Sequence, residues 1–471
     1  MRKPRYLNYR QVSSDPTLIT KADALANQHR SQSQQQRKNN RDFSAAFNAI
    51  LTNIEVYQAY DGWDLYIPTN NNLFTGKHKR NATYTTEIRD ALRWLIEEGY
   101  LKQVSGRSRP KKKDSDDRHW LPNVYRLSPK WLTEIASAPL SDPRLIQRNP
   151  VADYWQLRED TYDNNGKKHK VAITPTVEQL KTNVGVLEAT TKTLAAYDKL
   201  MSRVNTSIGS STIHPAQLSL TRVFSKGSFD LGGRLYAPIQ NYTKETRKYY
   251  YFDSEPTIEI DYSSIHPHML YHKEGLQFDG EDPYALEDFD RNAVKVAFNI
   301  MLNREACKPA AGTISKVVGC DTITAEALEA AIKNLHSPIA HHFNTGVGLR
   351  LQRTDSDIAL LVIDNFVNDL ERPIICVHDS FIVSVRDTES LILTMNDCYM
   401  AVHNDEIGMR AIKGGSLEFS EALTAAIGQC FEQETDTLTD SYWDALIAAE
   451  GVQECNEVGI AEEQTETLNT L

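Results

Sequence analysis

Apolar residues recur at helical spacing in two stretches near the start of the chain. The first runs from Phe43 to Tyr60, and the second begins at Thr85 or Thr86 and ends before Gly99, a typical C-cap residue. Residues 101–104 and 124–127 then alternate between apolar and polar positions, as the strands of a hairpin do. The pattern predicts two helices followed by a β-hairpin over residues 41–132.

The segments on either side of this unit are less regular. Residues 1–40 end in a Ser/Gln-rich stretch at 31–40 that cannot bury a core, so we expect a flexible N-terminal tail. Residues 133–176 contain Pro139, Pro143 and Pro150 and an Asn-Asn-Gly turn at 164–166, which is typical of a connector. Apolar residues return to helical spacing over 177–204.

Two short apolar runs further along the chain each lead into an aspartate. Asp261 follows Ile-Glu-Ile at 258–260, and Asp379 follows Ile-Ile-Cys-Val-His at 374–378. A single acid at the end of a strand is most often a turn residue. Two such acids from distant segments can instead converge on a pair of Mg²⁺ ions, which clamp the attacking and leaving oxygens of a phosphoryl transfer.

Four short elements occur around these aspartates. Residues 232–236 are Gly-Gly-Arg-Leu-Tyr, and residues 261–266 are Asp-Tyr-Ser-Ser-Ile-His. Residues 352–357 are Gln-Arg-Thr-Asp-Ser-Asp and lead into a helical run that continues to Phe366. Residues 377–379 are Val-His-Asp. Each of these strings is weak evidence when taken alone.

A fifth element is a pair of cations between the two aspartates. Arg291 and Lys295 are four residues apart, so both side chains lie on one face of a helix. A guanidinium and an ammonium in this arrangement can hold a triphosphate. A solvated basic stripe would have the same spacing.

In this order, the five elements resemble the palm of family A DNA polymerases and of the single-subunit phage and mitochondrial RNA polymerases. Residues 261–266 look like motif A, Arg291 and Lys295 have the spacing of motif B, and residues 377–379 look like motif C. The resemblance covers roughly residues 220–386. It implies an antiparallel palm sheet with helical fingers and a helical thumb, for which the helix over 177–204 is the candidate.

The resemblance also implies a role for each matching residue. Asp261 and Asp379 would hold two Mg²⁺ ions, with Mn²⁺ as an alternative, while Arg291 and Lys295 would neutralise a nucleoside triphosphate. The other matches are expected to contact substrate or nucleic acid: Tyr262 and His266 the nucleotide, Gln352 and His378 the primer terminus or minor groove, and Arg234 the template or product.

Some positions depart from the family pattern. Members of the family carry an aromatic residue four or eight positions after the motif B lysine, where this chain has Asn299 and Asn303. His266 replaces the Glu of the DNA polymerases and the Gly of the RNA polymerases, and its bulk favours deoxynucleotides. Ser380 and the 232–236 element look more like the RNA polymerases, which favours RNA synthesis.

The predicted unit at 41–132 resembles the winged-helix domains of replication initiators and repressors. In such domains the second helix enters the major groove and the hairpin loop contacts phosphates. That helix carries Arg89 and Arg93 here, and the loop between the hairpin strands is basic, with Arg107, Arg109, Lys111, Lys112 and Lys113. The alternative interpretation is an exposed basic loop beside an ordinary helical hairpin.

The distribution of charge agrees with nucleic-acid binding at the N-terminal end. The formal net charge is −11, but residues 432–471 contain eleven acids and no Lys or Arg, so the other 431 residues balance to zero. Residues 1–131 contain 23 Lys or Arg against 13 Asp or Glu. We expect an acidic, solvating C-terminal tail that is able to bind a protein partner.

Cysteine usage and hydropathy favour a soluble protein. The six cysteines show no Cys-x-x-Cys pairing, so neither a zinc site nor a disulfide framework is indicated. No signal peptide is evident, and no apolar run approaches the roughly 20 residues of a membrane span. We expect a cytoplasmic protein with reduced thiols.

These observations predict an α+β right-hand polymerase with an N-terminal winged helix. The expected parts are a tail at 1–40, the winged helix at 41–132, a connector and thumb-like helix at 133–204, palm and small fingers at 205–431, and the acidic tail at 432–471. The first hypothesis is a compact DNA-dependent polymerase, with RNA polymerase or primase activity favoured. Its partners would be a DNA template, a primer or RNA product, and nucleoside triphosphates. The alternatives are a family A-like DNA polymerase of a mobile element and a non-catalytic replication initiator with a degenerate palm.

Overall fold

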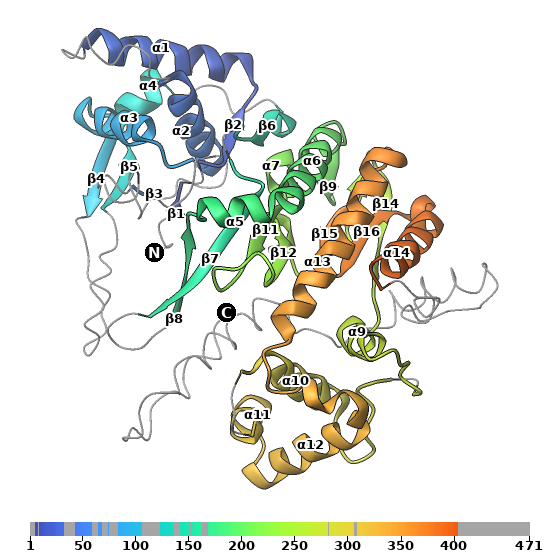
Figure 1. Ribbon diagram of the computed structural model, residues 1–471. Coiled ribbons are helices and arrows are strands. Elements are labelled where there is room, and N and C mark those ends of the chain that lie inside the picture. Colours follow the sequence, from blue (N-terminus) through green and yellow to red (C-terminus); the bar gives the residue numbers. More distant parts are fainter. Residues whose placement is uncertain are drawn as a thin grey trace.

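The computed structural model describes residues 5–7, 9–32, 43–58, 65–67, 74, 83–105, 123–135, 142–150, 152–162, 168–280, 282–305 and 309–403. The basic hairpin loop with Arg107, Arg109 and Lys111 to Lys113 lies outside these residues, as does the acidic tail at 432–471. The fold is mixed α+β, with helices and several sheets (Figure 1). Among the described helices, none is long and apolar enough to cross a membrane.

The N-terminal unit contains the predicted helices and hairpin. Helices α2 (Phe43–Gln58) and α3 (Thr86–Glu97) are followed by strands β4 (Leu101–Ser105) and β5 (Val124–Leu127), which pair antiparallel. Thr85 caps α3 by accepting a hydrogen bond from the Ile88 backbone, and Gly99 follows the helix with φ +78°. Two short strands and a helix complete the unit: β1 (Arg5–Tyr6), β3 (Leu65–Tyr66) and α4 (Pro129–Glu134).

The prediction of a flexible tail over 1–40 is wrong for much of this segment. Residues 16–32 form helix α1 (Pro16–Gln32), which buries Leu18 and Leu25 in the core of the N-terminal unit. Its last residue accepts a hydrogen bond from Trp94 Nε1 of α3 at 2.7 Å. Its apolar positions were overlooked because the Ser/Gln-rich residues at 31–40 dominated the composition.

The predicted connector at 133–176 is a second error, because most of its described residues lie in strands. After η4 (Pro143–Leu145), β6 (Ile146–Arg148) pairs with β2 (Gln11–Ser13). Strands β7 (Trp155–Tyr162) and β8 (Lys168–Ile173) form an antiparallel pair in a four-stranded sheet with β11 (Thr221–Phe224) and β12 (Gly232–Tyr236). The Asn-Asn-Gly sequence at 164–166 lies outside the described residues, but the strands before and after it, β7 and β8, pair with each other.

The helical pattern over 177–204 is confirmed as two helices, α5 (Val177–Thr182) and α6 (Val184–Met201), separated at Asn183. Helix α6 buries Leu194, Tyr197 and Met201 in the main core. Short helix α7 (Pro215–Leu218) follows and contacts both α6 and β6. Helix α6 thus packs between parts of the fold.

A six-stranded antiparallel sheet carries the two predicted aspartates. Its strand order is β10 (Ser211–Thr212), β9 (Thr206–Ile208), β13 (Tyr250–Phe252), β14 (Glu255–Asp261), β16 (Ser380–Ser384) and β15 (Ile375–Val377). Helix α14 (Thr388–His403) contacts β14 and β16 of this sheet. Helix α9 (Ile265–Lys273) contacts α14 and α13 (Gly348–Asp364), and α13 continues into the π-helical η7 (Asn365–Asp369). Three shorter segments are η5 (Pro238–Asn241), α8 (Lys244–Arg247) and η8 (Val385–Asp387).

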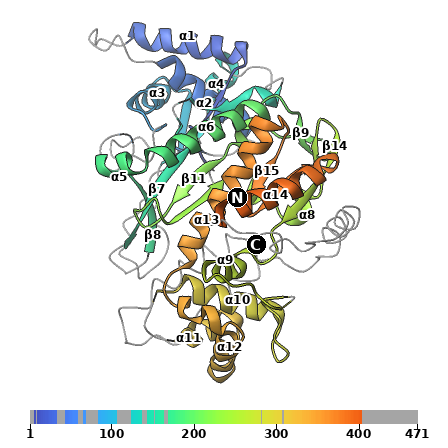
Figure 2. The same ribbon diagram turned by 45° about the vertical axis from the view of Figure 1, so that its right-hand side comes forward.

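A helical group lies at the opposite end of the molecule from the N-terminal unit (Figures 1 and 2). It contains α10 (Arg291–Asn303), α11 (Ala311–Val318), α12 (Thr322–Leu335) and η6 (Ser337–His342). Its apolar residues belong to the same buried cluster as those of the six-stranded sheet. The long helix α13 continues from this group past β12 and α6.

Gly233 permits the close approach of β12 to α13. Its backbone has φ +84°, and a Cβ there would lie 2.9 Å from Ser356 Oγ and 3.2 Å from Arg353 Cδ. Any larger residue would be strained both by the left-handed conformation and by these contacts. The glycine lets the strand that carries Arg234 lie directly against the helix that carries Gln352.

Candidate active site

The structure brings Asp261 and Asp379 together at one edge of the sheet. Asp261 is the last residue of β14 and pairs in register with Ser380, the first residue of β16. Asp379 immediately precedes Ser380, in the two-residue turn that joins β15 to β16. His378 begins this turn with a positive φ of 59°. Because of this register, two carboxylates that are distant in sequence become neighbours.

The charge environment of Asp261 is unfavourable for an isolated carboxylate. Asp261 keeps some contact with solvent, but the protein around it removes much of the hydration of its carboxylate. This loss of hydration raises the pKa of Asp261 well above the usual range, and the negative charges of Asp379 and Glu259 raise the pKa further. Lys295 and Lys244 act in the opposite direction. A bound cation would stabilise the ionised forms of both aspartates, so this arrangement favours metal binding.

Glu259 is a third carboxylate at the site, and the sequence interpretation missed it. It lies two residues before Asp261 on β14, so both side chains are on the same face of the sheet. Arg247 of α8 donates two hydrogen bonds to it, at 3.0 and 2.7 Å, and Ser380 Oγ donates a third at 2.8 Å. The alternation of Glu259 and Asp261 in the strand was the signal that could have identified it.

The two cations of α10 have different surroundings. Lys295 lies near enough to Asp261 to lower the pKa of its carboxyl group. Arg291, at the start of the helix, donates from Nε to Asp282 Oδ2 at 2.6 Å and lies 5.6 Å from the centre of the Tyr284 ring. The charge of Lys295 thus acts on Asp261, whereas Arg291 is paired with Asp282.

His266 and Arg234 meet at a buried carboxylate that the sequence did not single out. The side chain of Asp355 on α13 is 3% exposed, and its Oδ2 atom lies 2.9 Å from His266 Nε2 and 2.9 Å from Arg234 Nη2. Burial alone would raise the pKa of Asp355, but Arg234 and His266 more than offset this effect and hold it below the ordinary value. Gln352 lies three residues earlier on α13, on the same side of the helix.

His378 is positioned against the neighbouring sheet. Its ring meets that of Tyr236 edge-to-face, with 5.4 Å between the centroids. Tyr236 is the last residue of β12, the strand that also carries Arg234. Arg234, His266, Gln352 and His378 therefore come from four elements that meet beside the paired aspartates: β12, α9, α13 and the β15–β16 turn.

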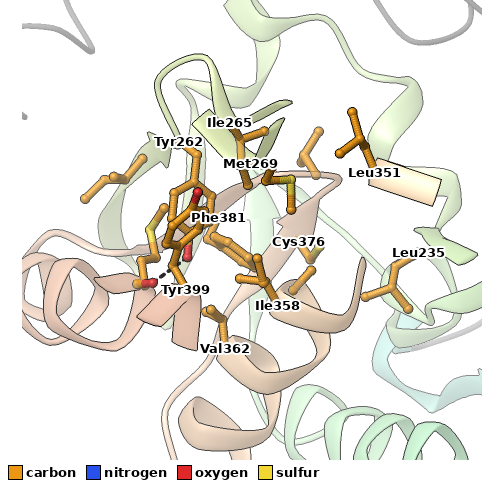
Figure 3. Packing of buried hydrophobic residues seen from close by; sticks show 14 of the residues in the cluster. Leu235, Tyr262, Ile265, Met269, Leu351, Ile358, Val362, Cys376, Phe381 and Tyr399 are labelled. Carbon is orange, nitrogen blue, oxygen red and sulfur yellow. Dashed lines mark hydrogen bonds between the residues drawn. The ribbon is translucent and has the colours of Figure 1, made fainter. Parts of the chain in front are cut away.

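Tyr262 does not have the exposure that a nucleotide contact requires. Its side chain is 3% exposed, and its hydroxyl donates to the Met395 backbone oxygen of α14 at 2.6 Å. Figure 3 shows it among core residues, beside Phe381 and Tyr399. The prediction that this side chain binds nucleotide does not fit its placement, because residues 261 and 262 point to opposite sides of the chain.

The aromatic residue of α10 also belongs to the core. Phe298 is fully buried and packs edge-to-face against Tyr284, His336 and Phe343. At the positions where the resembled enzymes carry an aromatic residue, Asn303 Nδ2 donates to the Asn299 backbone oxygen at 3.0 Å. The departure noticed in the sequence is therefore present in the structure, and Phe298 does not compensate for it.

The two arginines predicted to read DNA lie on α3 as expected, with mixed charge around them. Arg89 Nε donates to Asp90 at 2.7 Å, and its side chain is 14% exposed. Arg93 is half-buried, and Glu87 and Glu97 lie on the same helix. DNA binding by this helix stays a prediction, as does phosphate contact by the basic loop outside the described residues.

The donors at the paired aspartates suit a hard cation. Asp261 and Asp379 offer only carboxylate oxygens, which Mg²⁺ prefers, and Mg²⁺ usually takes one or two carboxylates and leaves other positions for water and phosphates. The strand register that brings Asp379 next to Asp261, where its charge raises the pKa of the Asp261 carboxyl group, supports this fit. Lys295 provides a positive charge for an anionic substrate bound beside them.

No protein-family model matches the chain, and no curated protein matches it significantly.

Proposed function

We propose that this protein is a template-directed nucleotidyltransferase: a compact, single-subunit, DNA-dependent polymerase that uses Mg²⁺. The observation that carries the proposal is the convergence of Asp261 and Asp379 at paired strand ends, with Lys295 beside them. The order of the sequence elements around these residues supports the same interpretation. An isolated turn aspartate would not explain why two carboxylates from distant segments lie at adjacent strand ends.

Each residue of the site has a role in this proposal. Two Mg²⁺ ions held by Asp261 and Asp379 would supply Lewis-acid stabilisation for transfer of a nucleotidyl group to a 3′-hydroxyl. Lys295 would neutralise the triphosphate, on whose leaving group negative charge increases in the transition state. Arg291 would assist if it exchanges Asp282 for phosphate. Arg234, Gln352 and His378 would line the path of template, primer or product.

The choice of sugar depends on His266. Its imidazole is tied to Asp355, so it would present a fixed, bulky group near the nucleotide, which suits deoxyribonucleotides. Ser380 and the 232–236 element favour ribonucleotides. We propose RNA synthesis, as by a primase or small transcriptase, with deoxyribonucleotide polymerisation as the second candidate supported by His266.

The N-terminal unit would guide this activity to duplex DNA. Its helix–helix–hairpin order and the excess of Lys and Arg over residues 1–131 support the proposal. Helix α3 would contact the major groove, and the basic loop would contact phosphates.

One extension assay tests the proposed activity. Purified full-length protein is incubated with primed or unprimed DNA template and with ribonucleotides or deoxyribonucleotides, in Mg²⁺ or in EDTA. We expect template-dependent products in Mg²⁺ and none in EDTA. No product under any combination of template, nucleotide and metal, from protein that binds DNA, would favour the non-catalytic initiator.

Replacing Lys295 with alanine should raise the apparent KM for nucleotide and lower kcat. The negative charge that Lys295 neutralises increases in the transition state. The substitution should therefore lower kcat as well as weaken nucleotide binding. Steady-state kinetics on a primed template would measure both constants. Lys273→Ala is the matched control, because Lys273 is exposed at the end of α9 and outside the motif. Equal, small effects at both positions would show that Lys295 belongs to a solvated basic stripe and does not bind the triphosphate.

A further inference from the structure

Three potential metal ligands converge at the end of α9, away from the paired aspartates. Glu274 Oε1 lies 2.7 Å from His342 Nε2 and 3.3 Å from His341 Nε2. All three ligand atoms lie within 4.8 Å of one another. The two imidazole rings are tilted neighbours, with 4.1 Å between their centroids. The Nε2 atoms of both histidines thus lie close to the same carboxylate oxygen, Glu274 Oε1.

The backbone on both sides of this cluster is anchored. Glu274 caps α9, and the buried His336, just before η6, lies 3.1 Å from the Tyr271 hydroxyl of α9 through Nδ1. His336 Nε2 also lies 2.8 Å from the Pro283 backbone oxygen. Thr345 Oγ1 donates to the His342 backbone oxygen at 2.6 Å. These contacts hold the ligand-bearing segments together before any ion binds.

We propose that Glu274, His341 and His342 form a binding site for a first-row transition-metal ion, with Zn²⁺ as the best match. Two imidazoles and a carboxylate are a donor set that zinc accepts, and water can take the fourth position because the side chains of Glu274 and His341 are 31% and 59% exposed. This site differs in chemistry from Asp261 and Asp379, which offer oxygen alone and suit Mg²⁺. It does not depend on the proposed polymerase activity.

The two distances from Glu274 to the histidines are close to those of a zinc site. With zinc–ligand bonds of about 2.0–2.2 Å, the ligand atoms of a tetrahedral site lie roughly 3.3 Å apart. The distance from Glu274 to His341 already has this value. The His342 imidazole would move outward by about half an ångström, and zinc would replace the proton that now lies between His342 and Glu274.

An ion at this position would join two parts of the fold. Glu274 ends α9, the helix that follows the strand of Asp261, whereas His341 and His342 lie in η6, after α10–α12. Zinc would therefore cross-link α9, which follows the six-stranded sheet, to the helical group. The competing interpretation is an ion pair between Glu274 and protonated histidines, which needs no metal.

Zinc titration of the full-length protein, in saturating Mg²⁺, tests the proposal. Isothermal titration calorimetry should show wild type binding one more Zn²⁺ than the His341→Ala/His342→Ala double variant. Glu274→Gln, a milder change, should weaken binding at this site at least about tenfold, since even outer-shell changes cost that much. Wild type and variants share all six cysteines, so zinc bound by thiols cancels in the comparison.

The matched control is Glu326→Gln, which changes an exposed glutamate on α12 and should leave zinc binding unchanged. Zinc should also raise the melting temperature of the wild type and of the control more than that of Glu274→Gln. Equal zinc stoichiometry and affinity in the wild type and the double variant would overturn the proposal and leave the ion pair as the explanation.

Discussion

Asp261→Asn is expected to abolish nucleotide incorporation while leaving DNA binding nearly intact. The substitution keeps the size of the side chain but removes a charged metal ligand. Metal ions supply several kcal/mol of transition-state stabilisation, so the loss should be about 10²–10⁴-fold. Asp379→Asn should behave in the same way. DNA affinity should change little, because it depends mainly on phosphate contacts elsewhere.

Stability measurements separate this loss from unfolding. In the absence of metal, folding raises the pKa of Asp261, so the folded state binds its proton more tightly than the unfolded state does. The ionised group therefore destabilises the fold once the pH exceeds the unfolded-state pKa. In EDTA at neutral pH, Asp261→Asn should be at least as stable as the wild type. Added Mg²⁺ should stabilise the wild type more than the variant.

Primer extension, DNA-binding titrations and thermal unfolding in EDTA and in Mg²⁺ would together test this expectation. Asp288→Asn is a suitable control, because Asp288 is exposed in the loop before α10. Incorporation by either active-site variant at more than about a tenth of the wild-type rate would contradict the metal-site assignment, since a single tenfold step corresponds to only about 1.4 kcal/mol.

The paired aspartates could be predicted because their signals are local. Each follows a run of apolar residues that forms a buried strand, and the Val-His-Asp turn is visible within a few residues. Their pairing required only that the two strands become neighbours, which the polymerase resemblance suggested. Helices α2 and α3 were predictable for the same reason, because apolar spacing and capping residues act within one or two turns.

Contacts between distant residues could not be predicted in this way. Arg234, His266 and Asp355 are far apart in sequence, and no local pattern shows that one carboxylate oxygen contacts both the guanidinium and the imidazole. The role of Arg247 as the partner of Glu259 is hidden for the same reason. Strands β7 and β8 were missed because turn residues between paired strands resemble those of a linker. The burial of Tyr262 follows from alternation along the chain, which the family resemblance obscured.

Asp355→Ala is expected to destabilise the protein by about 3 kcal/mol, because removing one partner of a buried ion pair leaves the other uncompensated. Asp355 is 3% exposed, and the side chain of its partner Arg234 is 12% exposed. His266 would lose its partner as well, so its ring should be less well fixed. Denaturant unfolding would measure the change, with Asp369→Asn as a control on an exposed carboxylate just after α13.

The same substitution should change the dependence of stability on pH. The folded-state pKa of Asp355 lies below its ordinary value of 3.8, so its contribution is fully present above that value and is lost as the pH falls toward the folded-state pKa. The difference in unfolding free energy between wild type and Asp355→Ala should therefore be constant near neutral pH and should shrink in acid. A double-mutant cycle with Arg234→Met should be non-additive, since Asp355 and Arg234 are in contact. Additive effects, or a difference that does not shrink in acid, would show that the pair does not contribute stability through its charges.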